Sequence, residues 1–79
     1  MKNASVVMSV SGHDKGTVYV ALKREGNFLF LCDGKNKLLS KPKKKNIKHL
    51  KELGVNIDLS VYSPLYDAHI VKSLKAYKK

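Results

Sequence analysis

The chain of 79 residues has no tryptophan, one cysteine, one arginine and only six acidic residues. A single cysteine cannot form an internal disulfide, which favours a reducing cytoplasm. No apolar run approaches the roughly 20 residues that span a bilayer, and the apolar stretch at the start is too short for a signal peptide. The length fits one small domain with no room for a cofactor domain, and the 43% hydrophobic content argues against wholesale disorder. We therefore expect a small, folded cytoplasmic protein.

Lysine is the residue that the chain has in excess, and it gives a net charge of +10. Eight lysines and no acidic residue lie between Lys35 and Lys51. Folding alone does not explain this self-repulsion, whereas a phosphate backbone does, because each lysine near a phosphate releases counterions. A solvated loop is the plainer alternative. An anionic membrane fits less well, because the block has neither an amphipathic helix nor a lipid anchor, and Pro42 opposes a helix.

The near absence of arginine favours recognition of the shape and backbone of a nucleic acid over the reading of base edges. Lysine is a flexible point charge, whereas arginine presents a rigid fork of donors that suits base edges. We predict that the main contacts to backbone phosphates are made by Lys41, Lys43, Lys44, Lys45 and Lys48. A second set consists of Lys15, Lys35, Lys37 and His49.

Alternation of apolar residues predicts short strands in the first fifty residues. The expected strands cover residues 6–10, 17–24, 28–32, 37–41 and 47–50, with turns at 11–16, 25–27 and 33–36. Connections this short cannot hold the helices that parallel strands need, so the sheet should be antiparallel. We expect a small closed barrel, because closure removes exposed strand edges. The continuous apolar run Phe28–Cys32 should be covered on both faces.

The last third of the chain has a different pattern. Residues 55–62 alternate, which predicts a sixth strand or an extended segment laid on the barrel. Ser63 and Pro64 then suit the N-cap and first position of a helix over residues 64–77. Its apolar positions should pack into the core, and they are Tyr66, Ile70, Val71, Leu74 and Tyr77.

One segment resembles a known family. Residues 7–22 contain a turn, Gly12-His13-Asp14-Lys15-Gly16, between two alternating strands, and this arrangement resembles a KOW motif. Downstream, the chain is similar to small stand-alone KOW-domain RNA-binding proteins, which in turn are similar to a KOW-bearing protein of the large ribosomal subunit. The matching features are Asp33-Gly34, Lys41-Pro42-Lys43 and Lys48-His49-Leu50, so the resemblance covers about residues 5–51. Tyr19 stands where many KOW motifs have another glycine.

The resemblance implies a mainly β fold. It implies an SH3-like barrel of the KOW type over residues 1–52, with an extended segment and a C-terminal helix packed on it over 53–79. It also implies that the protein binds RNA, often structured ribosomal RNA, as a ribosomal protein or a ribosome-associated factor in translation. No catalysis is implied.

Sites of other kinds find little support in the sequence. The turn at Gly12 and Gly16 lacks the spacing of a P-loop. No nucleophile elbow occurs, and an interior filled by Val, Leu and Phe should leave no pocket. We therefore expect no enzyme, cofactor or small-molecule substrate. The separations of His13, Cys32, His49 and His69 match no zinc-ligand pairing, so no metal is expected either.

Two further points concern the partner. Tyr19 shares a strand face with Ala21 and Lys23, so it is the tyrosine that we expect to be exposed and able to stack on an RNA base. A protein-interaction module that docks on an acidic surface of the transcription or translation machinery remains an alternative, and it should carry an exposed apolar patch. A basic architectural protein that binds DNA is a third possibility, since only the resemblance favours RNA over DNA.

Overall fold

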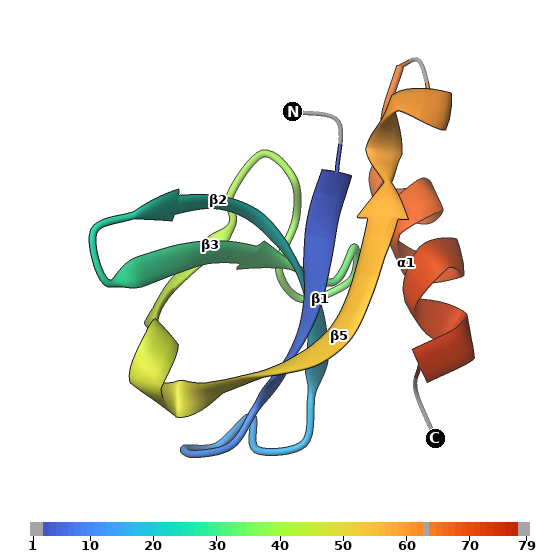
Figure 1. Ribbon diagram of the computed structural model, residues 1–79. Helices are drawn as coiled ribbons and strands as arrows, with labels where there is room; N and C mark the ends of the chain where they lie inside the picture. Colours follow the sequence, from blue (N-terminus) through green and yellow to red (C-terminus); the bar gives the residue numbers. More distant parts are fainter. Residues whose placement is uncertain (1–2, 63, 78–79) are drawn as a thin grey trace.

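A computed structural model describes residues 3–62 and 64–77, and within them the chain is mainly β. One antiparallel sheet has the strand order β4-β3-β2-β1-β5. Its strands are β1 (Asn3–Ser9), β2 (Val18–Glu25), β3 (Phe28–Cys32), β4 (Lys43–Asn46) and β5 (Leu50–Asp58). The short helix α1 (Asp67–Leu74) lies beside the sheet (Figure 1). The prediction of a mainly β chain with a C-terminal helix is confirmed.

The first three strands follow the alternation of the sequence closely. The expected strand at 28–32 is confirmed residue for residue, and those at 17–24 and 6–10 differ at their ends. The β1–β2 loop closes through main-chain bonds, with Gly16 N donating to Ser9 O at 2.8 Å and Thr17 N donating to Asp14 O at 2.9 Å.

The predicted strand at 37–41 is wrong. This part of the chain is a loop with only an isolated bridge between Leu38 and Lys41. The cause is Asp33, whose Oδ1 accepts bonds from the amides of residues 35, 36 and 37 at 2.9–3.0 Å. These amides surround the carboxylate, so they cannot form the hydrogen bonds of a β-ladder. The strand forms one step later, after Pro42, as β4 within the densest part of the lysine block.

The expected fifth strand at 47–50 is also replaced. Residues Ile47–His49 form the 3-10 helix η1, which Asn46 caps by accepting a bond from Lys48 N at 3.0 Å. The long strand β5 runs from Leu50 to Asp58 and includes the first half of the predicted segment 55–62. It is followed by the 3-10 helix η2 (Leu59–Val61).

The sheet is not closed, in contrast to the barrel closure expected from the sequence. Strands β4 and β5 are its two edges, and no pairing joins them in the described part of the chain. The physical reason is that β4 has only four residues, after which η1 carries the chain from one edge to the other.

Apolar side chains cover both faces of the sheet. On one face, Val6, Val20 and Cys32 pack with Ile70 and Leu74 of α1, and all five are fully buried. The concave face holds a smaller cluster of Val7, Tyr19, Ala21 and Leu31. Consecutive residues of β2 therefore belong to different clusters, as the pleat of a strand requires.

The C-terminal helix is shorter than predicted. It begins at Asp67, with Tyr66 in extended backbone as its N-cap, so Pro64 lies before the helix. The expected N-cap, Ser63, is outside the described residues. The helix starts here because Asp67 Oδ1 accepts a bond from Leu39 N at 2.7 Å, which ties its first turn to the loop after β3.

The helix continues into the 3-10 helix η3 (Lys75–Tyr77). Tyr66 and Tyr77 are exposed, so their predicted place in the core is wrong, whereas that of Ile70 and Leu74 is confirmed. Across residues 3–62 and 64–77, none of the helices has the length and apolar character needed to cross a membrane.

Candidate nucleic-acid interface

Strand alternation divides the lysines of β4 between two faces of the sheet. Lys43 and Lys45 lie opposite Leu31 and Leu29, which belong to the concave face. Lys44 lies opposite Phe30 and points the other way. The three consecutive lysines therefore have different surroundings, although the sequence does not distinguish them.

Lys43 and Lys45 both reach a carboxylate in the β1–β2 loop. Lys45 Nζ donates to Asp14 Oδ1 at 2.6 Å, and Lys43 Nζ donates to Asp14 Oδ2 at 3.1 Å. Two hydroxyls complete the group, since Ser9 Oγ donates to Oδ1 and Tyr19 Oη donates to Oδ2, each at 2.8 Å. This cluster of Ser9, Asp14, Tyr19, Lys43 and Lys45, the Asp14 cluster, fixes the β1–β2 loop against β4.

The Asp14 cluster is strongly polarised. Burial by itself raises the pKa of Asp14, but the hydrogen bonds from Lys45, Ser9, Tyr19 and Lys43 outweigh it and hold this pKa far below its ordinary value. Burial raises the pKa of Tyr19, and its bond to the Asp14 carboxylate raises it further. Asp14 is therefore a permanent anion and Tyr19 a permanent donor at neutral pH.

Membership of the Asp14 cluster limits what Lys45 can bind. Its side chain is only 11% exposed, and its ammonium also donates to Ser9 Oγ at 2.6 Å and to Ser11 O at 3.1 Å. A phosphate could reach it only by displacing these partners. Lys43 is less enclosed, with 33% of its side chain exposed.

The expectation that Tyr19 is exposed is wrong. Only 2% of the residue is accessible, because its hydroxyl is held by Asp14 and its ring lies in the concave cluster. Tyr19 in β2 is therefore a structural member of the Asp14 cluster rather than a stacking surface.

The loop of residues 33–42 carries three of the candidate lysines. Lys35 and Lys41 are exposed, and Lys37 is half-buried. Lys37, Lys41 and Lys43 together line a shallow hollow of about 410 Å³ between this loop and the start of β4. Lys15 is exposed in the turn of the β1–β2 loop.

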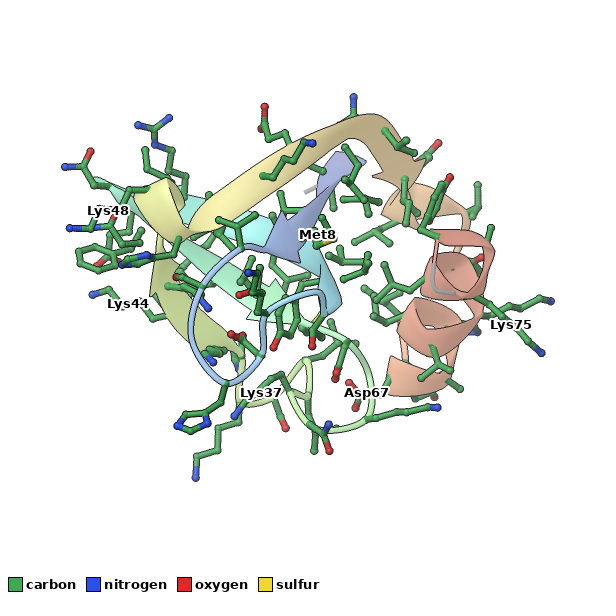
Figure 2. The ribbon with its side chains drawn as sticks, turned by 90° about the horizontal axis from the view of Figure 1, so that it is seen from below. Met8, Lys37, Lys44, Lys48, Asp67 and Lys75 are labelled. Carbon is green, nitrogen blue, oxygen red and sulfur yellow. The ribbon has the colours of Figure 1, made fainter. Side chains whose placement is uncertain are left out.

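The remaining candidates lie along β4 and η1. Lys44 and Lys48 are exposed, and Figure 2 shows them on the same side of the molecule, opposite Lys75 and α1. His49 is half-buried, and its Nδ1 forms a 2.8 Å hydrogen bond with Ser11 Oγ. The structure thus brings Lys44 and Lys48 onto one side, and places Lys45 and His49 in contacts that hold the β1–β2 loop.

Sequence reasoning missed two aromatic residues beside these cations. Phe28 is 38% exposed and Phe30 is half-buried, although the run Phe28–Cys32 was expected to be covered on both faces. Leu31 and Cys32 meet that expectation, but the start of β3 does not. The available signal was the spacing of two residues between the phenylalanines, which puts both rings on one face.

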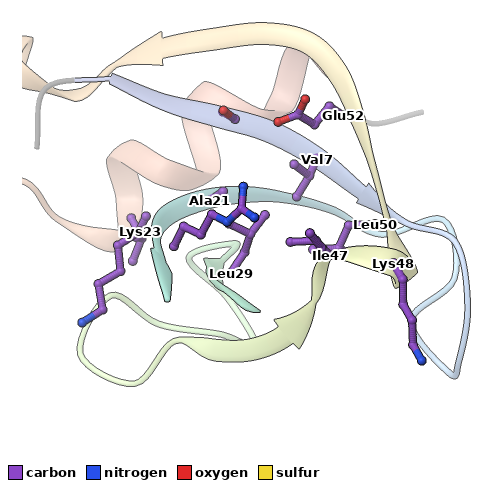
Figure 3. Close-up of a pocket in the computed structure, with 11 residues that line it drawn as sticks. Val7, Ala21, Lys23, Leu29, Ile47, Lys48, Leu50 and Glu52 are labelled. Atoms are coloured by element: carbon purple, nitrogen blue, oxygen red, sulfur yellow. The ribbon is translucent and has the colours of Figure 1, made fainter. Parts of the chain in front are cut away.

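A groove opens on the concave face, where we expected no pocket. It has a volume of about 730 Å³ and an apolar floor that includes Val7, Leu29, Ile47 and Leu50 (Figure 3). It exists because the sheet is not closed and the concave side chains are too few and too small to fill the space. Lys23, Lys48 and Glu52 also line it.

The candidate metal ligands lie in separate places. His49 bonds to Ser11, His69 stacks on the ring of Tyr62 at 4.3 Å, and Cys32 is fully buried in the core. No group of three or more His, Cys, Asp or Glu side chains suited to a metal occurs in the described ranges. Burial, with the nearby charges of Asp67 and Asp33, raises the pKa of the Cys32 thiol to about 12.

No protein-family model matches this chain, and no curated protein matches its sequence.

Proposed function

We propose that the protein binds structured RNA, ribosomal RNA in particular, through its exposed lysines, as a cytoplasmic ribosome component or ribosome-associated factor and not as an enzyme. The observation that carries this proposal is the hollow lined by Lys37, Lys41 and Lys43. Lys37 and Lys41 repel each other there, and Lys43 adds to the positive charge although its ammonium bonds to Asp14, so a phosphate group would relieve the repulsion.

The surroundings of the hollow support the same function. Lys44 and Lys48, exposed on β4 and η1, add positive charge on one side of the molecule (Figure 2), and Lys35 is exposed in the loop of residues 33–42. Asp14 is the acidic residue that two lysines of β4 contact, and it is already enclosed by four donors. Backbone phosphates would therefore meet cations whose own protein partners are few.

We also propose that the sheet is an SH3-like barrel of the KOW type that has an open side. The order β4-β3-β2-β1-β5, with a 3-10 helix between β4 and β5, supports this proposal. The turn that suggested the motif, residues 12–16, lies between β1 and β2 and is fixed against β4 by Asp14. In this account the barrel holds the lysine-bearing segments in one rigid arrangement.

Salt dependence tests the proposed function. Binding of a ribosomal RNA hairpin through about five phosphates should give a slope of log K against log[salt] near −3.5 to −4.5. The double substitution Lys41→Gln/Lys48→Gln should reduce the magnitude of that slope by about 1.5. Lys72→Gln/Lys75→Gln is the matched control, because it removes two exposed cations from the helical side. Equal slopes for the two double variants would contradict the proposed site.

The groove on the concave face favours a second candidate function, a protein-interaction module. Leu29, Ile47 and Leu50 on its lining are partly exposed and supply the apolar patch that such a module needs, and Lys48 would suit an acidic partner. Substituting Leu50→Ser in the groove should then abolish binding of the partner while RNA binding stays unchanged. Binding that is weakly salt-sensitive would favour this candidate over RNA.

A further inference from the structure

Two phenylalanines lie side by side on the outer face of the sheet, away from the groove. Phe28 and Phe30 share this face because they are two residues apart in β3, whereas Leu29 and Leu31 point to the concave side. Cys32, the next residue on the outer face, is fully buried under α1. Exposure rises along β3 away from the helix, from 0% at Cys32 to 38% at Phe28.

The helix does not extend over the two rings. Figure 1 shows the β2–β3 hairpin projecting away from α1, so the helix covers the sheet only near Cys32. Neither Phe28 nor Phe30 belongs to a cluster of buried core residues. The two rings therefore form an apolar surface that the packing of the described core does not require.

Lysines frame both rings. Lys23 Nζ lies 4.8 Å from the centroid of the Phe30 ring, and Lys44 Nζ lies 4.9 Å from that of Phe28 and 5.9 Å from that of Phe30. Each ammonium is within the range of a cation–π contact. Lys44 also pairs with Glu25 at 3.5 Å, but both side chains are largely exposed, so this pair opens at little cost.

We propose that Phe28 and Phe30 form a stacking platform for unpaired RNA bases, flanked by Lys23 and Lys44 as phosphate contacts. This inference rests on the proposed function and deepens it, because it assigns single-stranded RNA segments to this face. Exposed aromatic rings alternating with cations are the arrangement that binds single strands, since every base has a face that can stack. The ammonium groups can swing from the rings to the phosphates of the same strand, because lysine is long and flexible.

The platform explains the use of phenylalanine on a strand face where an exposed position would ordinarily take a polar residue. RNA recognition by stacking targets loops, bulges and ends, whose bases are not already paired. The lysines of the hollow and of η1 would meanwhile bind the backbone phosphates of the RNA helix next to the unpaired bases. The preferred ligand is then a hairpin or bulged RNA rather than a continuous duplex.

Fluorescence anisotropy with two labelled probes tests this inference at one fixed salt concentration. One probe is an unstructured single-stranded RNA, and the other is an RNA duplex of the same length. Phe28→Ala should raise the Kd for the single strand by roughly fivefold to a hundredfold, the range expected for one lost stacking contact, and that for the duplex by less than about twofold. Phe28→Tyr should retain affinity, because it keeps an aromatic ring, whereas Phe28→Leu should not.

Controls separate stacking from folding and from general charge. Tyr66→Ala removes an aromatic ring that is 61% exposed at the start of α1, and it should leave both Kd values unchanged. A Phe28→Leu variant that binds as well as wild type, or a Phe28→Ala variant with an unchanged single-strand Kd, would overturn the platform while leaving RNA binding by the lysines intact. If wild type binds neither probe, the proposed function itself fails, and the platform with it.

Discussion

Lys45 Nζ lies 2.6 Å from Asp14 Oδ1, and this contact joins the middle of β4 to the β1–β2 loop. The two side chains are only 11% and 16% exposed, so the ion pair is largely shielded from water. A residue that looks like one more cation of a lysine block is therefore part of the framework. The pair fixes the loop that carries Lys15 against the strand that carries Lys44.

The contribution of the Asp14 cluster to stability should depend on pH in the acid range. Because the pKa of Asp14 is lowered in the folded chain, the unfolded chain binds its proton first as pH falls below the ordinary value of 3.8. The stabilisation is complete above about pH 5 and is lost progressively at lower pH. In Asp14→Asn, the decrease of unfolding free energy below about pH 3.5 should be shallower by up to about 1.4 kcal/mol per pH unit, as measured by urea titrations. Parallel profiles for the two proteins would contradict the assignment.

Removing either Lys45 or Asp14 should lower the free energy of unfolding by more than the ion pair contributes to it. Lys45→Met leaves Asp14 with fewer donors, and Asp14→Asn leaves Lys45 enclosed without a counter-charge, so each should lower the free energy of unfolding by about 3 kcal/mol. The double variant should be destabilised by clearly less than the sum, because neither partner is left alone. Additive losses in denaturant melts would mean that the two residues act independently.

The Asp14 cluster decides which lysines can be substituted to test binding. The sequence places Lys43, Lys44 and Lys45 together among the main predicted contacts. The structure shows that Lys45 is a member of the Asp14 cluster, so a triple alanine variant would confuse lost binding with lost stability. Lys41 and Lys48, both exposed, are the cleaner positions.

Docking of the helix depends on a close approach at Gly34. This residue has φ +80°, and a Cβ here would meet the carbonyl oxygen of Asp67 and lie 2.7 Å from Val71 Cγ2. Gly34→Ala should lower the free energy of unfolding by about 2–4 kcal/mol, from both backbone strain and the clash. Gly54→Ala is the matched control, since it has φ +71° but nothing within 4 Å of the added Cβ.

The comparison of the two glycine variants uses thermal or denaturant melts. Gly54→Ala should show only the backbone cost of about 1–2 kcal/mol. An equal loss for both variants would mean that the contact between Gly34 and the helix contributes nothing.

Cys32 should report unfolding rather than binding. It is fully buried, and its thiol pKa is raised to about 12, so almost no thiolate forms at pH 8. A thiol reagent such as DTNB should label the native chain only at the rate at which the structure opens, and RNA should not change the intrinsic reactivity of the thiol. Labelling of the native chain at the rate of an unfolded control would contradict this burial.

Alternation of apolar residues predicted the strands that pair with the next strand along the chain. The hairpin of β2 and β3 is the best case, because alternation and the turn at residues 25–27 act together. Strand β4 could not be predicted, since lysine has low strand propensity and the strand depends on pairing with β3. Asp33 likewise turns a plausible strand into a loop through three bonds that no alternation pattern reveals.

The candidate site, like the fold, could be predicted from the sequence only in part. The lysine block was evident from charge alone, but which lysines face outward depends on the register of β4 against β3. Tyr19 was expected to be exposed and Phe28 to be covered, and the structure shows the reverse. Tyr19 is buried because its hydroxyl bonds to Asp14, and Phe28 is exposed because it lies in the part of the hairpin that the helix does not cover. Both outcomes depend on contacts between residues distant in the sequence.

The central claim is that this protein binds structured RNA, and its contacts in the native cytosol test that claim most directly. The protein would be crosslinked in its own cytosol, sedimented on a gradient, and the attached RNA sequenced. The account predicts comigration with ribosomal subunits and crosslinks clustered in one stretch of ribosomal RNA that contains unpaired bases. Sedimentation with a protein complex, without enriched RNA, would contradict it and favour the groove as a protein-docking site.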